Sequence, residues 1–361
     1  MKNIIIGLSL NLLLNCTSVY SQETMKTDTF SFSFEGKRLR GFIDLPTNQV
    51  VRSIIIIVPG DGKTHLNWYN DIRSHFVKIG IACCEWDKMG CGESEGEYHQ
   101  QPVQNSADEV LAAIEELKHR NIEGSDKIGF WGISRAGWIC PLVIQKYPIA
   151  YWISVSGTDD KENFAYLLES NFRALGKSED EIKMLVGEWF KGEEIFRNGG
   201  SPEQYLAATE HLQKDSFCIK NFGYGKINAE EYKRNQENSK SEKQLYDKET
   251  GLMIYIPNFK DLLNKIQCPV LAIFGEKDCN VDWRKTLALY KETIGSNKAT
   301  TLTIKTFPDG NHGILKCKTG GINEKFTESE KHLYGYWQEC DGYYDTMLNW
   351  LTDKGFGKKT E

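Results

Sequence analysis

The chain has 361 residues, of which 40% are hydrophobic and 26% charged, with 50 acidic against 44 basic side chains. These proportions are ordinary for globular proteins, so they exclude extensive disorder and fibrous repeats. A net charge of −6 without a basic cluster argues against nucleic acid as a partner.

The N-terminal segment has the order of a cleavable secretory signal. Lys2 precedes an apolar run from Ile4 to Leu14, and a short polar stretch follows. The sequence therefore predicts that residues 1–21 are removed on export to the periplasm or to the medium. Acylation of Cys16 after cleavage, as in a lipoprotein, is the alternative. No later segment reaches about 18 uninterrupted apolar residues, so no stable membrane span is expected.

The next part of the chain alternates between strand and helix patterns. Aromatic residues at 30, 32 and 34 alternate with polar ones before Gly36, which is typical of a hairpin. The run 54–58 is continuously β-branched, as in a strand buried on both faces. Further strands are expected at 81–86, 127–131 and 151–156, and helices at 66–79, 107–120 and 135–147. Such alternation predicts an α/β fold with a mostly parallel sheet flanked by helices.

The rhythm breaks between residues 157 and 266, where charged and aromatic residues form helix-like patches. Alternation then resumes, with strands expected at 269–274 and 301–307 and helices at 281–293 and 343–351. We therefore expect a signal peptide at 1–21, a core formed by 22–156 and 267–361, and a large, mainly helical cap (lid) insertion at 157–266.

A candidate nucleophile lies on a sharp turn. The strand ending at Trp131 runs through Gly132 and Ile133 into Ser134, and a helix follows at once. A serine on such a strained turn needs small neighbours two residues before and after it, and Gly132 and Ala136 meet that need. The alternative is an ordinary glycine-rich turn.

A serine nucleophile needs a base, and the base needs a carboxylate that orients it. Asp278 follows the strand that ends at residue 274, and His312 follows the next strand, between glycines. His65 is a rival base that precedes the serine. The rival carboxylates are Asp282, which is expected to cap a helix, and Glu276, which is very close to the strand end.

Negative charge that develops on an attacked carbonyl needs preorganised donors. The backbone N–H groups of Arg135, at the start of the helix, and of Asp61, in the glycine-rich loop after strand 54–58, are the predicted oxyanion hole.

In the order of these pieces the sequence resembles the α/β-hydrolase superfamily, in particular its bacterial serine esterase branch. It is similar to dienelactone hydrolases and to the catalytic domain of prolyl oligopeptidases. The matching segments are residues 58–62, 87–96, 132–142, 275–278 and 310–313. The resemblance implies that Asp87 and Ser94 shape a loop and are not catalytic. It covers the sheet and hardly touches the insertion, and the departures at Asp61 and Ala136 remove no catalytic atom.

The sequence thus predicts an exported serine esterase that forms an acyl-enzyme on Ser134, without metal or organic cofactor, and takes a small-molecule ester as its partner. The alternatives are a peptidase, amidase or acyltransferase with the same triad, or a binding protein that kept the fold without the chemistry. Oligomeric state stays open. The pocket between cap and sheet is expected to be lined by aromatic and imidazole side chains, with hydrophobic core as the alternative for each: His65, Trp138, Trp152, Trp189, Phe190, Tyr205 and Tyr255. Cys317 and Cys340 flank a late loop and are candidates for a disulfide.

Overall fold

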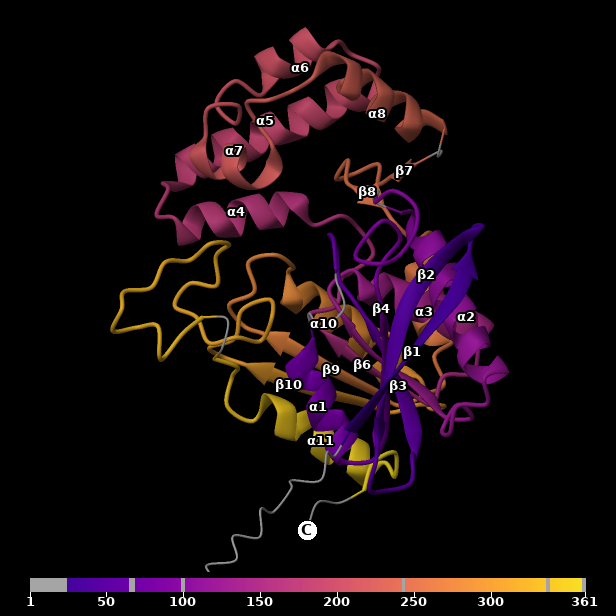
Figure 1. Ribbon diagram of the computed structural model, residues 1–361. Coiled ribbons are helices and arrows are strands. Elements are labelled where there is room, and N and C mark those ends of the chain that lie inside the picture. Colours follow the sequence, from indigo (N-terminus) through magenta and orange to yellow (C-terminus); the bar gives the residue numbers. More distant parts are fainter. Residues whose placement is uncertain (1–24, 65–68, 99–100, 242–243, 336–337, 359–361) are drawn as a thin grey trace, which may run out of the picture.

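The computed structural model describes residues 25–64, 69–98, 101–241, 244–335 and 338–358. The predicted signal segment, Cys16 and His65 lie outside these residues. An eight-stranded sheet in the order β1-β2-β4-β3-β5-β6-β9-β10 forms the centre of the molecule (Figure 1). Its strands are β1 (Met25–Phe34), β2 (Lys37–Pro46), β3 (Ser53–Val58), β4 (Ile81–Trp86), β5 (Ile128–Ile133), β6 (Tyr151–Val155), β9 (Val270–Gly275) and β10 (Leu302–Phe307).

Pairing within the sheet follows the sequence pattern. β1 and β2 form an antiparallel hairpin, in which Glu35 and Gly36 make the tight turn with φ of 47° and 71°. β2 pairs antiparallel with β4, and all the remaining pairs are parallel. Every residue of β3, β4, β6 and β9 is buried, as the continuous apolar runs predict. The expected mostly parallel α/β sheet is therefore confirmed.

Helices cover both faces of the sheet. One hydrophobic cluster joins the sheet to α1 (Asn70–Lys78) and α11 (Tyr343–Asp353). The cluster on the opposite face includes α2 (Val103–His119), α3 (Ala136–Lys146), α9 (Phe259–Asn264) and α10 (Trp283–Glu292), followed by the short 3-10 helix Ile294–Ser296. These two layers hold the loops at the carboxyl ends of the parallel strands in fixed positions.

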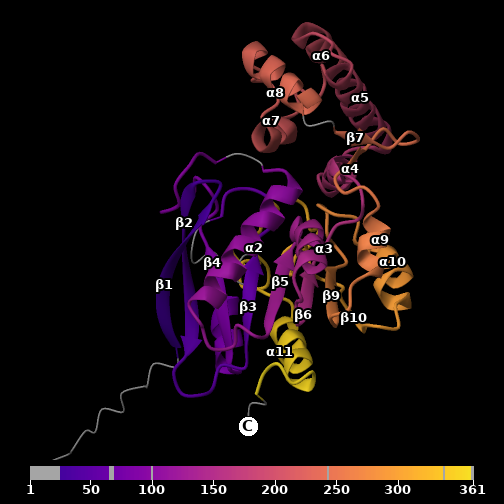
Figure 2. The same cartoon turned by 90° about the vertical axis from the view of Figure 1, so that its right-hand side faces the viewer.

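The insertion is mainly helical, as expected, and rises above that edge of the sheet (Figures 1 and 2). It contains α4 (Phe164–Ala174), α5 (Glu179–Arg197), α6 (Pro202–Ala208), α7 (Ser216–Phe222), α8 (Ala229–Ser241) and the small hairpin of β7 (Leu245–Tyr246) and β8 (Met253–Ile254). Leu168, Phe172 and Trp189 belong to a separate hydrophobic cluster inside it. α9 falls within the range 157–266, but its residues Phe259 and Leu263 pack into the core, on the face of the sheet that α3 and α10 cover.

Cysteines and membrane-spanning potential can be stated for the described part of the chain. All nine cysteines there are buried free thiols, so Cys317 and Cys340 do not form the disulfide considered from the sequence. Within the same residues, no helix combines the length and apolar character that crossing a bilayer requires.

Candidate active site

Ser134 lies on the turn between β5 and α3, in the left-handed region at φ 57°. Its N–H donates to the carbonyl of Val155 at 2.9 Å, which ties the turn to β6. A Cβ on Gly132 would come within 2.9 Å of both Ala136 Cβ and Cys140 Sγ. The crowding expected two residues before and after the serine is therefore present, and it leaves the Ser134 side chain half-buried at the sheet edge.

Asp278 and His312 come together because β9 and β10 are parallel neighbours. A Cβ on Gly275 would lie 2.2 Å from the carbonyl oxygen of Asn311, so the two loops touch directly. His312 Nδ1 lies 2.8 Å from Asp278 Oδ2, and the Asp278 side chain is fully buried. With Nδ1 donating to the carboxylate, the lone pair of the neutral imidazole is on Nε2, where a base needs it.

The other oxygen of Asp278 is also satisfied. Its Oδ1 accepts from the N–H groups of Asn280 at 2.8 Å and Val281 at 3.0 Å, which fixes the carboxylate in place. The rival Asp282 caps α10, where its side chain accepts from Arg284 N–H at 3.3 Å, as expected. Geometry thus singles out Asp278 as the partner of His312.

Ser134 and His312 line the same cavity. Among the residues that the structure describes, they make no hydrogen bond to each other. Contacts of this kind are commonly long in free enzymes and tighten in the substrate complex. The structure therefore brings together the loops of the predicted triad, with the Asp278–His312 contact formed.

The loop that carries Asp61 runs beside the serine. A Cβ on Gly60 would meet Ser134 Cβ at 3.2 Å. Lys88 fixes this loop in place, because its Nζ donates to the carbonyls of Gly60 at 2.6 Å and Gly62 at 2.8 Å. Burial, with the charge of Arg135 in second place, lowers the pKa of Lys88 to about 8. Lys88 was not singled out from the sequence, although it lies in the loop segment 87–96.

Arg135 begins α3, and its backbone N–H belongs to the first turn, where intrahelical partners are lacking. Its guanidinium donates to Ser106 Oγ at 3.0 Å and to the carbonyl of Gln101. Asp61 and Arg135, whose N–H groups are the expected oxyanion donors, both line the cavity with Ser134. The loop 87–96 is held as the resemblance implies: Ser94 Oγ donates to the carbonyl of Asp87 at 2.7 Å.

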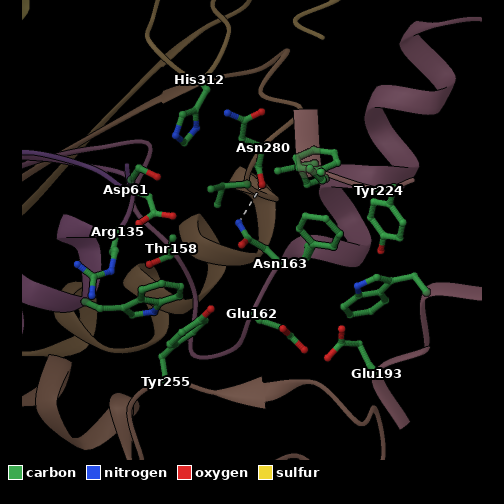
Figure 3. A pocket seen from close by; sticks show the side chains of 18 of the residues that line it. Asp61, Arg135, Thr158, Glu162, Asn163, Glu193, Tyr224, Tyr255, Asn280 and His312 are labelled. Atoms are coloured by element: carbon green, nitrogen blue, oxygen red, sulfur yellow. Dashed lines mark hydrogen bonds between the residues drawn. The ribbon is translucent and has the colours of Figure 1, made fainter. Parts of the chain in front are cut away.

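A cavity of about 590 Å³ opens between sheet edge and cap (Figure 3). It joins residues from distant parts of the chain, and its lining consists of Asp61, Ser134, Arg135, Trp138, Thr158, Glu162, Asn163, Phe164, Leu167, Trp189, Glu193, Tyr205, Phe222, Gly223, Tyr224, Ile227, Tyr255, Asn280, Val281 and His312. Its volume is in the range of small-molecule sites.

Four of the predicted lining residues reach this cavity: Trp138, Trp189, Tyr205 and Tyr255. Trp138 and Tyr255 pack against each other with ring centroids 4.2 Å apart, and Trp138 Nε1 donates to the carbonyl of Asp159 at 2.5 Å. These two rings close the cavity on the side of α3.

Two expectations need correction. Trp152 is completely buried in the core, where its ring centroid lies 5.7 Å from that of Tyr290, because its position in β6 points to the face covered by α10. Phe190 packs within the cap cluster and is not part of the cavity wall. His65 lies outside the described residues.

Two acidic residues of the cavity were not predicted from the sequence. Glu162 precedes α4, and Glu193 lies on α5. Burial raises the pKa of Glu162, and burial together with the charge of Glu162 raises the pKa of Glu193 to about 7. Both residues resemble ordinary surface glutamates of a charged insertion, and only the packing of the cap brings them together.

The cap is tied to the loop of Asp278 by hydrogen bonds from α4. Tyr166 Oη donates to the carbonyl of Asp278 at 2.8 Å, and Ser170 Oγ and Asn171 Nδ2 donate to that of Cys279 at 2.7 and 3.1 Å. Just before the helix, Asn163 Nδ2 donates to the carbonyl of Asn280 at 2.9 Å. The cap and the loop of Asp278 are therefore connected by hydrogen bonds.

In residues 25–358, apart from the gaps named above, no group of three or more His, Cys, Asp or Glu side chains is arranged to hold a metal ion.

Comparison with known proteins supports the fold. No protein-family model matches the sequence. The structure is similar to the proline iminopeptidase of Mycobacterium smegmatis, with a TM-score of 0.52 and 14% identity over 91% of this chain and 98% of that one. It is also similar to the acylaminoacyl peptidase of Pyrococcus horikoshii, with a TM-score of 0.52 and 14% identity over 94% of this chain and 43% of that one. The α/β-hydrolase fold expected from the sequence is thus confirmed.

One curated protein is similar in sequence. Acyltransferase drtE of Aspergillus calidoustus is 27% identical over 134 residues, which cover 34% of this chain. The chain spans less than half of that relative, 44% of its length. The chain thus combines an α/β-hydrolase fold with a capped cavity beside a serine on a sharp turn.

Proposed function

We propose that this protein is a serine hydrolase that cleaves a carboxylic ester through an acyl-enzyme on Ser134. One observation carries the proposal: a serine held at φ 57° shares a cavity with a histidine whose Nδ1 is bonded to a buried carboxylate. A weak nucleophile needs this combination of exposure, base and orienting acid. A tetrahedral intermediate also requires donors to its oxyanion, and the proposal assigns this role to the main-chain N–H groups of Asp61 and Arg135, which line the same cavity.

The proposed reaction has two halves. Ser134 Oγ attacks the acyl carbon while Nε2 of His312 takes its proton, and the carbonyl oxygen becomes an oxyanion beside the N–H groups of Asp61 and Arg135. The bond to the alcohol oxygen then breaks, and His312 gives that oxygen the proton. Water attacks the acyl-enzyme by the same route, His312 returns the proton to Ser134, and the carboxylic acid leaves. Asp278 stabilises the imidazolium in both halves.

Replacing the nucleophile tests this proposal. Ser134→Ala should lower kcat/KM for short p-nitrophenyl esters by at least about 10⁴-fold, because the remaining groups only bind and polarise the ester. His312→Ala should have an effect of similar size, whereas His119→Ala, on the exposed end of α2, should leave the rate unchanged. Retained turnover in Ser134→Ala would refute the mechanism.

A fluorophosphonate probe separates an enzyme from an inert binding protein on the same scaffold. The probe should label the wild type at Ser134, as mapped by mass spectrometry, and should leave Ser134→Ala unlabelled. Rates on matched ester and amide substrates then distinguish an esterase from a peptidase or amidase.

Acyl transfer is the second candidate, favoured by the 134-residue similarity to an acyltransferase. In that case an alcohol or amine replaces water in the second half of the reaction. Adding such acceptors during ester turnover should then divert acyl groups into a new ester or amide, detectable by mass spectrometry. A product mixture that stays purely hydrolytic would favour the esterase.

We also propose that the protein is exported, on the strength of the signal pattern at residues 1–21. The N-terminal residue of the mature protein from the native host would test this. Cleavage after residue 21 supports a free exported protein, an acylated Cys16 supports a lipoprotein, and an intact N-terminus in the cell extract contradicts both.

A further inference from the structure

The cavity continues from Ser134 into the cap, where its chemistry changes. In Figure 3, Asp61, Arg135 and His312 lie on one side, and Glu162, Glu193 and Tyr224 lie on the other. The carboxylates of Glu162 and Glu193 point toward one another in this view. Two acidic groups therefore face the space that a substrate bound at the serine would enter.

These carboxylates have little compensation from the protein itself. Glu162 Oε1 accepts one bond, from Met253 N–H at 2.9 Å. No Lys, Arg or His nitrogen of the described chain forms an ion pair with either glutamate within 4.0 Å. The charge of Arg197 lowers the pKa of both glutamates, but its guanidinium donates to the carbonyls of Gly251 and of Glu193 instead of a carboxylate.

Aromatic rings surround the acidic pair. Trp189 lies one helical turn before Glu193 on α5, so both side chains leave the helix on the same face. The Phe164 ring lies 5.7 Å from the Trp189 ring, and Phe222 lies 4.9 Å from Phe164. Tyr224 completes this part of the lining. Ring faces attract cations, and they do so most strongly where water is excluded.

We infer that the cap end of the cavity binds an ammonium group, so that the preferred substrates are esters with a cationic amine remote from the scissile bond. The inference rests on the proposed function, since it names the substrate class of the same site. An ammonium would supply the counter-charge that Glu162 and Glu193 lack and would contact the rings of Trp189 and Phe164. A neutral alkyl group of equal size would leave both carboxylates uncompensated.

Isosteric substrates test this inference. p-Nitrophenyl 6-aminohexanoate and p-nitrophenyl heptanoate differ only by NH₃⁺ in place of CH₃ on the acyl chain. Choline butyrate and 3,3-dimethylbutyl butyrate place a cation on the alcohol instead, with a quaternary N⁺ in the first where the second has a quaternary carbon. We expect kcat/KM to be about 10-fold or more higher for the cationic member of at least one pair, mainly through KM, as a desolvated charge contact is worth that much.

Matched variants assign the effect to the acidic pair. Glu162→Gln and Glu193→Gln should each lower the ratio of the two kcat/KM values, cationic over neutral, about 10-fold. Glu194→Gln, on the exposed side of the same helix, should keep the wild-type preference. Equal rates for both members of both pairs, or a preference that Glu193→Gln leaves intact, would overturn the inference.

Direct binding separates this inference from the proposed function. Hexylammonium should bind the wild type and quench the tryptophan fluorescence more strongly than 1-hexanol does, and Glu193→Gln should remove the difference. If ester hydrolysis is absent but this binding is present, the esterase proposal fails and the ammonium site stands. If the protein hydrolyses esters but neither binds hexylammonium selectively nor prefers cationic esters, the ammonium site fails and the esterase proposal stands.

The cationic preference should also depend on pH. Glu193, with its pKa of about 7, is mostly protonated at pH 6 and mostly ionised at pH 8. The ratio of the two kcat/KM values should therefore rise over this interval in the wild type, and the rise should be smaller in Glu193→Gln. The other ionisable groups facing Glu193 are Glu162, Arg197, and five tyrosines that burial keeps neutral: Tyr205, Tyr224, Tyr232, Tyr246 and Tyr255.

Discussion

Two pairs of acidic side chains lie away from bulk water. One pair, Asp44 and Glu85, lies in the core, and the other, Glu162 and Glu193, lies in the cap cavity. The core pair has a cation of its own: Arg73 Nη1 lies 2.8 Å from Asp44 Oδ2, and its Nε lies 3.7 Å from Glu85 Oε2. All three of these side chains are at most 2% exposed. The cavity pair has no such ion pair within the described chain.

Two further contacts hold the core group in place. The guanidinium of Arg73 lies 4.0 Å from the centroid of the Phe42 ring, and Asp44 Oδ1 accepts from Thr27 Oγ1 at 2.6 Å. The counter-charge of the core pair thus comes from the chain itself. The contrast teaches that burial of carboxylates alone does not indicate a binding site; burial beside a cavity without an internal counter-charge does.

The largest effect should come from breaking the core group. Arg73→Met keeps the length of the side chain and removes its charge, which leaves Asp44 and Glu85 buried together without a cation. The free energy of unfolding should fall by about 3–5 kcal/mol, as measured by urea denaturation at pH 7. Arg52→Met, at an exposed position beside β3, should change it by less than about 0.5 kcal/mol. A loss below about 1 kcal/mol in Arg73→Met would mean that the core group contributes little.

An intermediate effect should follow from giving the cavity pair the counter-charge that the core pair has. Ile227 is half-buried in the cavity wall, between α7 and α8. Ile227→Lys places a flexible ammonium in the same cavity, where it competes with a cationic substrate. The preference for the cationic ester should fall about 10-fold, equivalent to about 1.4 kcal/mol. Ile227→Met, of similar length without charge, is the control and should keep the preference; an unchanged ratio in Ile227→Lys would count against the acidic pair as its source.

The smallest effect concerns the stability of the free protein. The pKa of Glu193 in the folded state, about 7, is above its ordinary value near 4.5, so Glu193 favours folding below pH 4.5 and loses that contribution as pH rises through 7. Glu193→Gln should therefore raise the free energy of unfolding at pH 8 by about 0.5–1 kcal/mol and leave it nearly unchanged at pH 4. Thermal unfolding at the two pH values measures the difference. If Glu193→Gln is instead destabilised at pH 8, Glu193 stabilises the fold, which would contradict its assignment to ligand binding.

Local patterns in the sequence were sufficient to predict the sheet and its chemistry-bearing loops. Continuous β-branched runs indicate buried parallel strands, and the crowding around Ser134 depends on residues within two positions of it. Asp278 and His312 could be paired because each follows a strand, and parallel strands place such loops at one edge. None of these inferences needs knowledge of how the insertion packs.

The rest depended on packing between distant segments. Glu162 and Glu193 are 31 positions apart and meet only through α4 and α5, and nothing in their local sequence distinguishes them from exposed glutamates. Trp152 was assigned to the pocket on its aromatic character alone, whereas a strand alternates its side chains between two faces and this one faces α10. The role of Lys88 depends on the carbonyls of a loop 26 to 28 residues earlier.

The hydrogen bonds from α4 to the main-chain oxygens of residues 278 and 279 constrain how this protein can be re-engineered. Tyr166, Ser170 and Asn171 supply them, so α4 holds the loop of Asp278 in position. A chimaera in which the cap is replaced from residue 157 onward would lose these hydrogen bonds together with the original specificity. A replacement that begins after Ala174 would keep the hydrogen bonds and exchange only the rest of the cap.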